Sequence, residues 1–262
     1  MFVEEIIIRE TASQPSIVLR DGRYHLRFAR TAADLDAVLK LRFEVFNLEL
    51  GKGLAASFLT GRDQDQFDPT CHHLMVIDDQ SDRVVGTYRM QTGEMAAANG
   101  FYSSGEFDLS QLPTNVLNNS IELGRACIAR EHRQTNVLYL LWKGLAAYVA
   151  HQRKRYLFGC CSLTSQDARE GWAVTKLLHE GGHFHPSLFV PPGPGFECTL
   201  EDPEGSALPQ TKIPKLFRTY LRFGAKVCGP PAIDREFSTI DYFVVLDVND
   251  LDALSRRMLF GM

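Results

Sequence analysis

The stretch Ile121-Glu122-Leu123-Gly124-Arg125-Ala126-Cys127-Ile128-Ala129 decides how the rest of this sequence is interpreted. Its apolar residues predict a buried strand, yet it carries Glu122 and Arg125, and burying a charge without a partner is costly. Side chains three residues apart on a regular strand point to opposite faces, but one extra residue, most easily accommodated at Gly124, returns them to one face. We therefore expect both charges to face one cleft. The alternative is a buried ion pair that serves only the fold.

Three other segments also place charges among apolar residues. Arg42 lies late in a helical pattern, Asp65 and Asp68 lie in an acidic turn, and Arg89 closes an apolar strand. Each has a structural alternative, namely a solvated helix residue, turn hydrogen bonds, or a strand-end arginine that reaches solvent. The segments are Leu41-Arg42-Phe43-Glu44-Val45-Phe46, Asp63-Gln64-Asp65-Gln66-Phe67-Asp68 and Val84-Val85-Gly86-Thr87-Tyr88-Arg89-Met90.

In chain order these signals are Arg-x-x-Val-Phe, Asp-x-Phe-Asp, Val-Val-Gly-x-x-Arg and Glu-Leu-x-Arg. The order resembles the acyl-homoserine lactone synthases and related acyl-carrier-protein-dependent N-acyltransferases of the GNAT superfamily. Residues 223–232 and 234–247 look most like the bacterial ornithine lipid N-acyltransferases. The resemblance implies an α/β fold, a single GNAT-like domain with a mixed, centrally splayed β-sheet flanked by helices. We expect this domain at 24–250, with a lead-in at 1–23 and a tail at 251–262.

Composition narrows the function classes. The chain has 262 residues, 45% of them hydrophobic, and a net charge of −4, which argues against a general nucleic-acid binder. Its longest apolar stretch, 137–149, falls short of the roughly 20 residues that span a bilayer. Six scattered cysteines predict reduced thiols in the cytoplasm. Phe2 to Ile8 carries acidic residues and predicts an irregular lead-in or edge strand rather than a signal peptide.

The spacing of apolar residues predicts antiparallel strands early in the chain, followed by a strand-helix-strand crossover. A hairpin is expected where two strands flank a polar turn, and Thr31 is expected to cap the first helix. The expected strands are 24–28, 73–78, 83–92, the charged strand ending at 129, 156–163 and 237–247, and the expected helices are 32–50, 136–152, 165–180 and a basic helix within 212–226.

An amine acyltransferase must bring a thioester carbonyl to a neutral amine and stabilise the resulting oxyanion, and it needs no protein nucleophile. Glu122 is the candidate base, and a backbone N–H near Gly124, Arg125 and Ala126 is the candidate oxyanion donor. An amino-acid acceptor also brings a carboxylate and a positive charge. We expect Arg42, Arg89 and Arg125 to bind the carboxylate of the acceptor. We expect Asp65 and Asp68 to bind its positive charge.

The start of the helix after the charged strand suits the phosphate of a phosphopantetheine arm, with Arg130, His132 and Arg133 beside it. Residues 133–137 lack the two glycines of the pyrophosphate loop found in acetyl-CoA-using members of the superfamily. The resemblance therefore favours acyl carrier protein as donor. The alternative is a basic loop without a ligand.

Five cations recur at helical spacing between residues 212 and 226, with apolar residues on the other face. Such a helix docks an acidic carrier protein, lies on anionic lipid headgroups, or is simply solvated. The cations are Lys212, Lys215, Arg218, Arg222 and Lys226.

His179-Glu180-Gly181-Gly182-His183 matches a zinc-hydrolase pattern, but the paired glycines and Pro186 indicate a helix end instead. The resemblance implies transfer of a fatty acyl group, with or without a 3-hydroxyl, from acyl carrier protein to the α-amine of ornithine, giving lyso-ornithine lipid. The residues alone support only an acidic and guanidinium-lined site for an amine acceptor. We expect no cofactor beyond that acyl-phosphopantetheine substrate, no metal, no nucleic acid, and a cytoplasmic protein that is either free or peripheral at the inner membrane face. The alternatives are an acyl-homoserine lactone synthase or other N-acyl amino acid synthase, a non-catalytic acyl- or lipid-binding module and, last, a zinc hydrolase.

Overall fold

The computed structural model describes residues 14–200 and 207–260. It separates into two compact units. Among the described residues, the first contains 14–99, 123–154 and 257–260, and the second contains 100–122, 155–200 and 207–256. Strand β5 (Ser120–Ile128), the charged strand, passes from the second unit to the first after Glu122. The expected strand at Phe2 to Ile8 lies outside the described residues.

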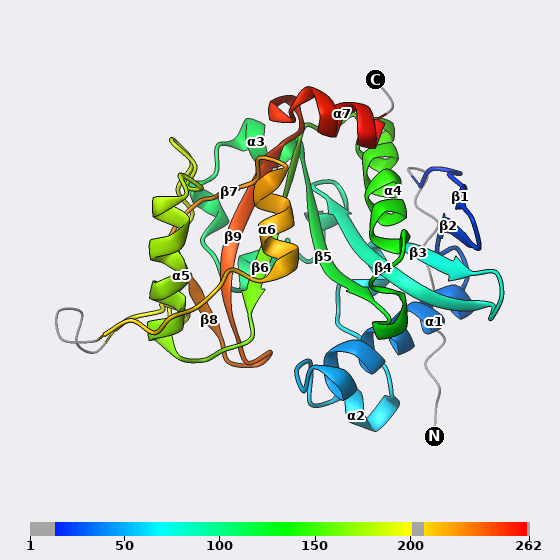
Figure 1. The fold of residues 1–262 in the computed structure, drawn as a ribbon, viewed down its shortest axis with the longest axis horizontal. Helices are drawn as coiled ribbons and strands as arrows, with labels where there is room; N and C mark the ends of the chain where they lie inside the picture. The colour runs from blue at the N-terminus through cyan, green and yellow to red at the C-terminus, as the bar shows by residue number, and fades with distance from the viewer. Residues whose placement is uncertain (1–13, 201–206, 261–262) are drawn as a thin grey trace. The chain divides into compact units, whose positions relative to one another are not determined.

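The first unit is built on an antiparallel sheet (Figure 1). The predicted hairpin is confirmed, with Met75 opposite Thr87. A short first strand, in the part expected as a lead-in, pairs with the second. The strands are β1 (Leu19–Asp21), β2 (Tyr24–Phe28), β3 (His72–Asp78) and β4 (Arg83–Thr92).

Helices α1 (Ala32–Phe43), α2 (Ser57–Thr60) and α4 (Val137–Gln152) belong to this unit. Thr31 caps α1 as predicted, in a reciprocal arrangement with Asp34. The expected helix 32–50 continues beyond α1 as a π-helix, η1 (Glu44–Glu49). Gly144 lets α4 lie close to the sheet, because a Cβ there would come within 2.7 Å of the Leu26 side chain.

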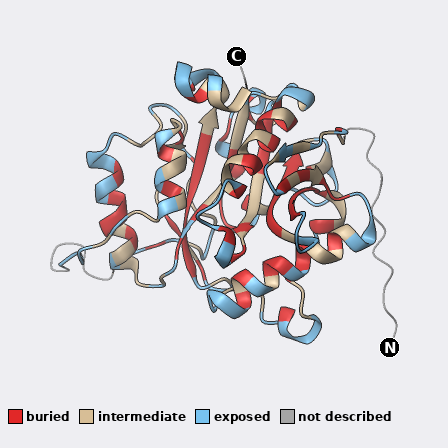
Figure 2. Ribbon diagram, turned by 45° about the vertical axis from the view of Figure 1, so that its right-hand side comes forward, coloured by how far each residue is buried: buried red, intermediate tan, exposed pale blue. Residues whose placement is uncertain are grey.

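The second unit has the mixed part of the sheet. The start of β5 is parallel to β6 (Tyr156–Leu163), with Ser120 opposite Tyr156, as the predicted crossover requires. β6 is antiparallel to β9 (Thr239–Asp247), which also pairs with β7 (Lys226–Val227) and β8 (Ala232–Asp234). Figure 2 shows the strands as mostly buried or intermediate and the helices with one exposed side. The predicted mixed α/β architecture is confirmed.

Helices α3 (Thr114–Asn118), α5 (Ala168–Glu180) and α6 (Lys215–Arg222) belong to the second unit, and α7 (Ala253–Phe260) lies near the end of the chain. Leu178, Phe217 and Tyr242 belong to one buried cluster that joins α5, α6 and β9. The short 3₁₀ segments are η2 (Asp68–Thr70), η3 (Met95–Ala97), η4 (Tyr102–Gly105), η5 (Leu109–Gln111), η6 (Arg130–His132) and η7 (Val248–Asp250).

Two boundaries differ from the predictions. The basic helix ends at Arg222, and Lys226 lies in β7, because Gly224 has a φ of +90° and breaks the helical path. Helix α5 ends at Glu180, and the positive φ of Gly182 shows that the paired glycines stop the helix, as the sequence predicted. The two histidines of the zinc-hydrolase pattern therefore do not share a helical turn.

All six cysteines are free thiols, in agreement with the sequence. Within residues 14–200 and 207–260, every helix is too short or too polar to cross a bilayer.

Candidate functional site

The irregularity expected in β5 is present, but at Arg125 rather than Gly124. Arg125 has a φ of +49°, the left-handed region that a residue with a Cβ adopts only at a cost of roughly 1–2 kcal/mol. Gly124, which would adopt it without that cost, is not among the residues with positive φ. The prediction that Gly124 forms the kink was therefore wrong. The kink lies at Arg125 because the partners of the Arg125 side chain hold that residue in place.

Arg125 belongs to a buried ionic cluster in the first unit. Its Nη2 lies 3.0 Å from Asp65 Oδ2, and its Nε lies 3.4 Å from Asp63 Oδ2. Arg89 Nη1 donates to Asp65 at 2.6 Å and to Asp68 at 3.0 Å. The ionic cluster consists of Arg42, Asp63, Asp65, Asp68, Arg89 and Arg125.

Arg42 is the innermost member. Its guanidinium has no exposed surface, and it donates to Asp68 at 2.6 and 3.2 Å and to Asp63 at 3.2 Å. Burial alone would raise the pKa of Asp68, but the charges of Arg42 and Arg89 outweigh it and hold that pKa far below its usual value. Three guanidiniums and three carboxylates thus balance each other inside the unit.

His73 lies against this cluster as a neutral side chain. Burial lowers the pKa of His73 to about 4, although the charge of Asp68 opposes the shift. Its Nε2 lies 3.0 Å from the backbone oxygen of Asp68, which can only accept, so Nε2 carries the proton. The histidine therefore fixes the turn that supplies the aspartates.

The structure brings together Arg42, Asp65, Asp68, Arg89 and Arg125, all proposed from the sequence as acceptor-binding residues. Asp63 and His73 complete the group without having been proposed. Asp63 stands in the same acidic turn, so its position was a usable signal. The role of His73 was not predictable from its strand.

Glu122 lies in the second unit, and its partners are not those of the ionic cluster. Its Oε2 accepts from Tyr102 N at 2.8 Å, and its Oε1 accepts from Ser103 N at 2.7 Å and from Ser103 Oγ at 2.6 Å. These donors belong to the first turn of η4. Glu122 therefore caps this turn and is held in one orientation. Because Glu122 and Arg125 are each bound by partners in their own unit, their pairing in one cleft stays a prediction.

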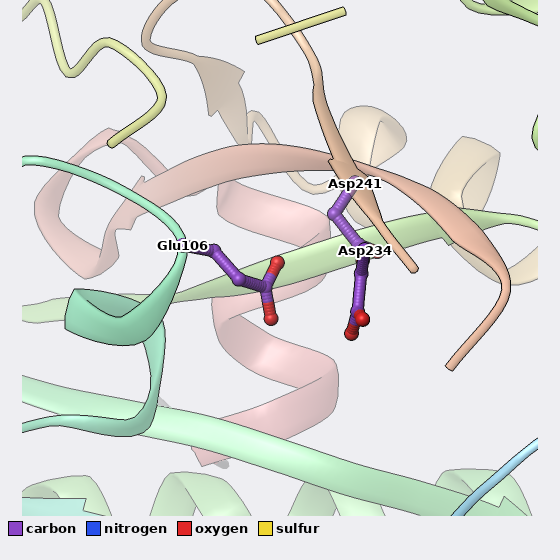
Figure 3. Close-up of side chains that lie close together, drawn as sticks. All are labelled: Glu106, Asp234 and Asp241. Carbon is purple, nitrogen blue, oxygen red and sulfur yellow. The ribbon is translucent and has the colours of Figure 1, made fainter. Parts of the chain in front are cut away.

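A second group of carboxylates in this unit escaped the sequence analysis. Glu106, Asp234 and Asp241 place their carboxylate oxygens within 4.8 Å of one another, and all three are buried. In Figure 3 the Glu106 side chain points toward the two aspartates of β8 and β9. We call these three residues the acidic triad. Oxygen ligands of this kind suit a hard divalent cation or an ammonium group.

Backbone and hydroxyl donors orient the triad. Asp234 Oδ1 accepts from Glu236 N at 2.8 Å and from Phe237 N at 3.0 Å, and Asp241 Oδ2 accepts from Thr239 Oγ1 at 2.8 Å. Two like charges about 5 Å apart repel by roughly 3 kcal/mol at an effective dielectric constant near 20. A bound cation would relieve this repulsion. The sequence signal was weak, because the three residues belong to separate segments.

Cys160 links the triad to Glu122. Its Sγ lies 3.5 Å from Ser103 Oγ. Burial raises the pKa of the Cys160 thiol, and the charges of Glu106, Asp241 and Glu122 raise it further. Glu122 and Cys160 share Ser103 as a partner, and the candidate base and the acidic triad belong to the same unit.

The three residues proposed to bind the phosphopantetheine arm differ in their burial and in their partners. His132 is buried, and its Nδ1 lies 2.9 Å from Tyr24 Oη, so it does not face a ligand. Arg133 makes a two-point ion pair with Glu49 at 2.7 Å. Arg130 is exposed and has no ion pair within the described part of the chain. Of the three, Arg130 alone presents a charge open to a phosphate.

Comparison with known proteins identifies the family of this chain. Residues 41–143 match the model of the acetyltransferase (GNAT) domain. An L-ornithine N(alpha)-acyltransferase from Agrobacterium fabrum is 32% identical over 88% of this chain and 83% of its own length. The chain belongs to the L-ornithine N(alpha)-acyltransferase family. A second member, from Rhodobacter capsulatus, is 31% identical over 89% of this chain and 93% of its own length.

The solved structure of FeeM, an N-acyl amino acid synthase from uncultured soil microbes, has the same fold. It superposes with a TM-score of 0.51 and 10% identity, and the match covers 87% of this chain and 92% of FeeM. Membership of the L-ornithine N(alpha)-acyltransferase family confirms the resemblance drawn from the four charged segments. All four lie within the matched GNAT range.

Proposed function

We propose that this protein transfers a 3-hydroxyacyl group from the thioester of acyl carrier protein to the α-amine of ornithine, giving lyso-ornithine lipid. Its relatives are named L-ornithine N(alpha)-acyltransferases, and they align over most of the chain. The observation that carries the proposal is the group of four buried carboxylates in the second unit, Glu106, Glu122, Asp234 and Asp241. An acceptor with two ammonium groups requires such an environment.

The two ammonium groups of ornithine need different treatment. The α-ammonium must lose a proton before it attacks the thioester, and we assign Glu122 as the base. The side-chain ammonium must stay charged and bound, and the acidic triad supplies carboxylates for it. This division would distinguish ornithine from amino acids with uncharged side chains.

The amine then attacks the thioester carbonyl directly. We assign the oxyanion to backbone N–H groups around Gly124 and Ala126, where the left-handed φ of Arg125 interrupts the regular strand. The collapse of the tetrahedral intermediate forms the amide bond and releases the carrier thiol. An acyl-cysteine intermediate is disfavoured, because burial raises the pKa of Cys127 to about 12 and that of Cys160 well above its ordinary value.

The ionic cluster acts in this proposal by positioning. Its arginines are already bound to aspartates, and Arg42 has no exposed surface, so we do not assign Arg42 to direct capture of the substrate carboxylate. The cluster instead holds Arg125 in its left-handed conformation. That conformation sets the direction of the neighbouring N–H groups in β5.

A carrier protein is the proposed donor because the loop before α4 lacks the paired glycines that would surround a pyrophosphate, and because Arg130 offers one open cation for a single phosphate. We place the reaction in the cytoplasm, since six free, mostly buried thiols suit a reducing compartment.

The test is product analysis by mass spectrometry after purified protein is mixed with 3-hydroxyacyl carrier protein and ornithine. We expect one amide product on the α-nitrogen, and a much slower reaction with acyl-CoA. Turnover of S-adenosylmethionine instead would indicate a lactone synthase, and a bound acyl chain without turnover would indicate a binding module. Metal analysis and chelator treatment decide whether the acidic triad holds a divalent cation, which would overturn its assignment to ammonium.

A further inference from the structure

Helix α6 carries a row of exposed cations. Lys215, Arg218 and Arg222 are spaced by three and four residues, so they lie on one side of the helix. Lys212, in the segment leading into α6, is exposed as well. We call these four residues the basic face. Lys226 does not belong to it, because it lies in β7 and its Nζ donates to the Gly182 oxygen at 2.7 Å.

No ion pair joins the basic face to a carboxylate within residues 14–200 and 207–260. Several other exposed arginines of the protein do form such pairs. Arg83 pairs with Glu44, Arg155 with Asp247, and Arg169 with Asp167. The whole chain carries a net charge of −4, so the concentration of unneutralised positive charge on α6 is local. Such a surface attracts an anionic partner.

The opposite side of α6 is fixed in the core. Phe217 and Leu221 are buried in the cluster formed with β6 and β9, and Tyr220 packs against that cluster. The rings of Phe217 and Tyr242 lie 5.7 Å apart. Figure 1 shows α6 running along these strands. The helix therefore presents its charges from a rigid support.

This packing argues against insertion of α6 into a membrane, and the proposed function supplies an acidic protein as the partner. A helix that lies in a membrane interface buries its apolar side in the lipid. The apolar side of α6 is already buried in the protein, so only charge is left for binding. An acidic protein surface is recognised by charge complementarity alone, with fast association that weakens as salt increases.

We propose that the basic face of α6 docks the acidic carrier protein that delivers the acyl thioester. This inference rests on the proposed function, which requires a carrier-bound donor. It assigns recognition of the carrier to a surface that is distinct from the acidic triad.

The test compares two charge-reversal variants of the full chain. The first carries Lys215→Glu, Arg218→Glu and Arg222→Glu. The control carries Lys40→Glu, Lys176→Glu and Arg257→Glu, three cations on α1, α5 and α7 that change the net charge equally. For the first variant we expect the KM for acyl carrier protein to rise about tenfold or more, with kcat unchanged. Kinetics with a carrier-free acyl-pantetheine thioester should be unchanged in both variants.

Binding of unacylated carrier protein, followed by fluorescence anisotropy at 50 and 300 mM salt, tests docking without turnover. Wild type and control should bind, and the α6 variant should bind at least tenfold more weakly. Equal losses in both variants would overturn the proposal, as would unchanged binding in the α6 variant. Loss of binding to vesicles of anionic phospholipid, with carrier binding intact, would assign the basic face to a membrane instead. If wild type binds carrier but forms no product, the proposed reaction fails while the docking surface stands.

Discussion

Arg42 and Asp68 form a two-point ion pair without any exposed surface, with Nη1–Oδ1 and Nη2–Oδ2 distances of 2.6 and 3.2 Å. Removing one partner of such a pair leaves the other charge buried and uncompensated, which costs about 3–5 kcal/mol. We therefore expect Asp68→Asn to lower the free energy of unfolding in urea by about this amount. Asp36→Asn is the control, since Asp36 pairs with Lys40 and Arg62 at a partly exposed site, where each such pair contributes less than about 1 kcal/mol. Equal losses in the two variants would refute the buried role.

Much of the architecture was predictable from the sequence. The first hairpin, α4 and β6 follow from alternating or helical apolar spacing, and their observed bounds lie within a residue or so of those predicted. Most of the ionic cluster was predictable as a set of residues, because its arginines interrupt apolar segments and two of its aspartates lie in one acidic turn; Asp63, in the same turn, was not proposed. Its internal pairing was not, since sequence spacing does not tell whether an arginine binds an aspartate of the protein or a substrate.

The acidic triad could not be predicted from the sequence. Glu106 lies between two short 3₁₀ segments, Asp234 ends β8, and Asp241 lies inside β9. Taken alone, none of the three differs from an ordinary turn or strand carboxylate. Only tertiary packing brings the three together. The position of the strand irregularity was also misplaced, because the partners of Arg125 outweigh the backbone preference of Gly124.

Two adjacent histidines predict a loss of stability in mild acid. Burial lowers the pKa values of His72 and His73 to about 4, whereas an unfolded histidine titrates near 6.5. Between these values the unfolded chain binds protons that the folded chain does not, so stability is complete above pH 6.5 and decreases as the pH falls toward 4. The loss should reach roughly 2–3 kcal/mol per histidine.

The measurement is urea unfolding at half-unit steps from pH 7.5 to 4.5. A double variant, His72→Asn with His73→Gln, should be less stable at pH 7.5 but should show a flatter pH dependence. The same slope in wild type and double variant would assign the acid sensitivity to other groups.

Glu122 is expected to be essential for turnover. Glu122→Gln should lower kcat at least 100-fold, since a positioned base contributes about 10²–10⁴. Ser103→Ala removes one of the three donors to Glu122 and should lower kcat moderately. It should also move the acidic limb of the kcat/KM profile to higher pH, because the carboxylate loses a donor that stabilises its charged form.

Ser110→Ala is the matched control, because the Ser110 hydroxyl bonds Asp108 at an exposed site. Its kinetics should equal those of wild type. A Glu122→Gln variant with normal kcat and a lowered melting temperature would show that Glu122 only caps η4.

The acidic triad should determine acceptor preference. Asp241→Asn and Glu106→Gln each remove a charge beside the proposed ammonium site, and we expect the KM for ornithine to rise about 10- to 100-fold, the value of one or two charged hydrogen bonds. The KM for norvaline, which has the same chain length without the ammonium, should change little. Asp250→Asn, at an exposed aspartate of the same unit, serves as control. Parallel increases for both amino acids would remove the triad from acceptor recognition.

The C-terminal end of α4 offers a stabilising substitution at a residue that has no part in the proposed chemistry. Arg153 follows the last helical residue with a φ of +54°, and its side chain is exposed. Glycine adopts this conformation without steric cost, so Arg153→Gly should raise the free energy of unfolding by about 1 kcal/mol. Arg153→Ala retains the Cβ and should give no gain. Because the predicted gain comes from the backbone alone, salt should not change it; equal stability of the two variants would mean that the left-handed cap carries no strain.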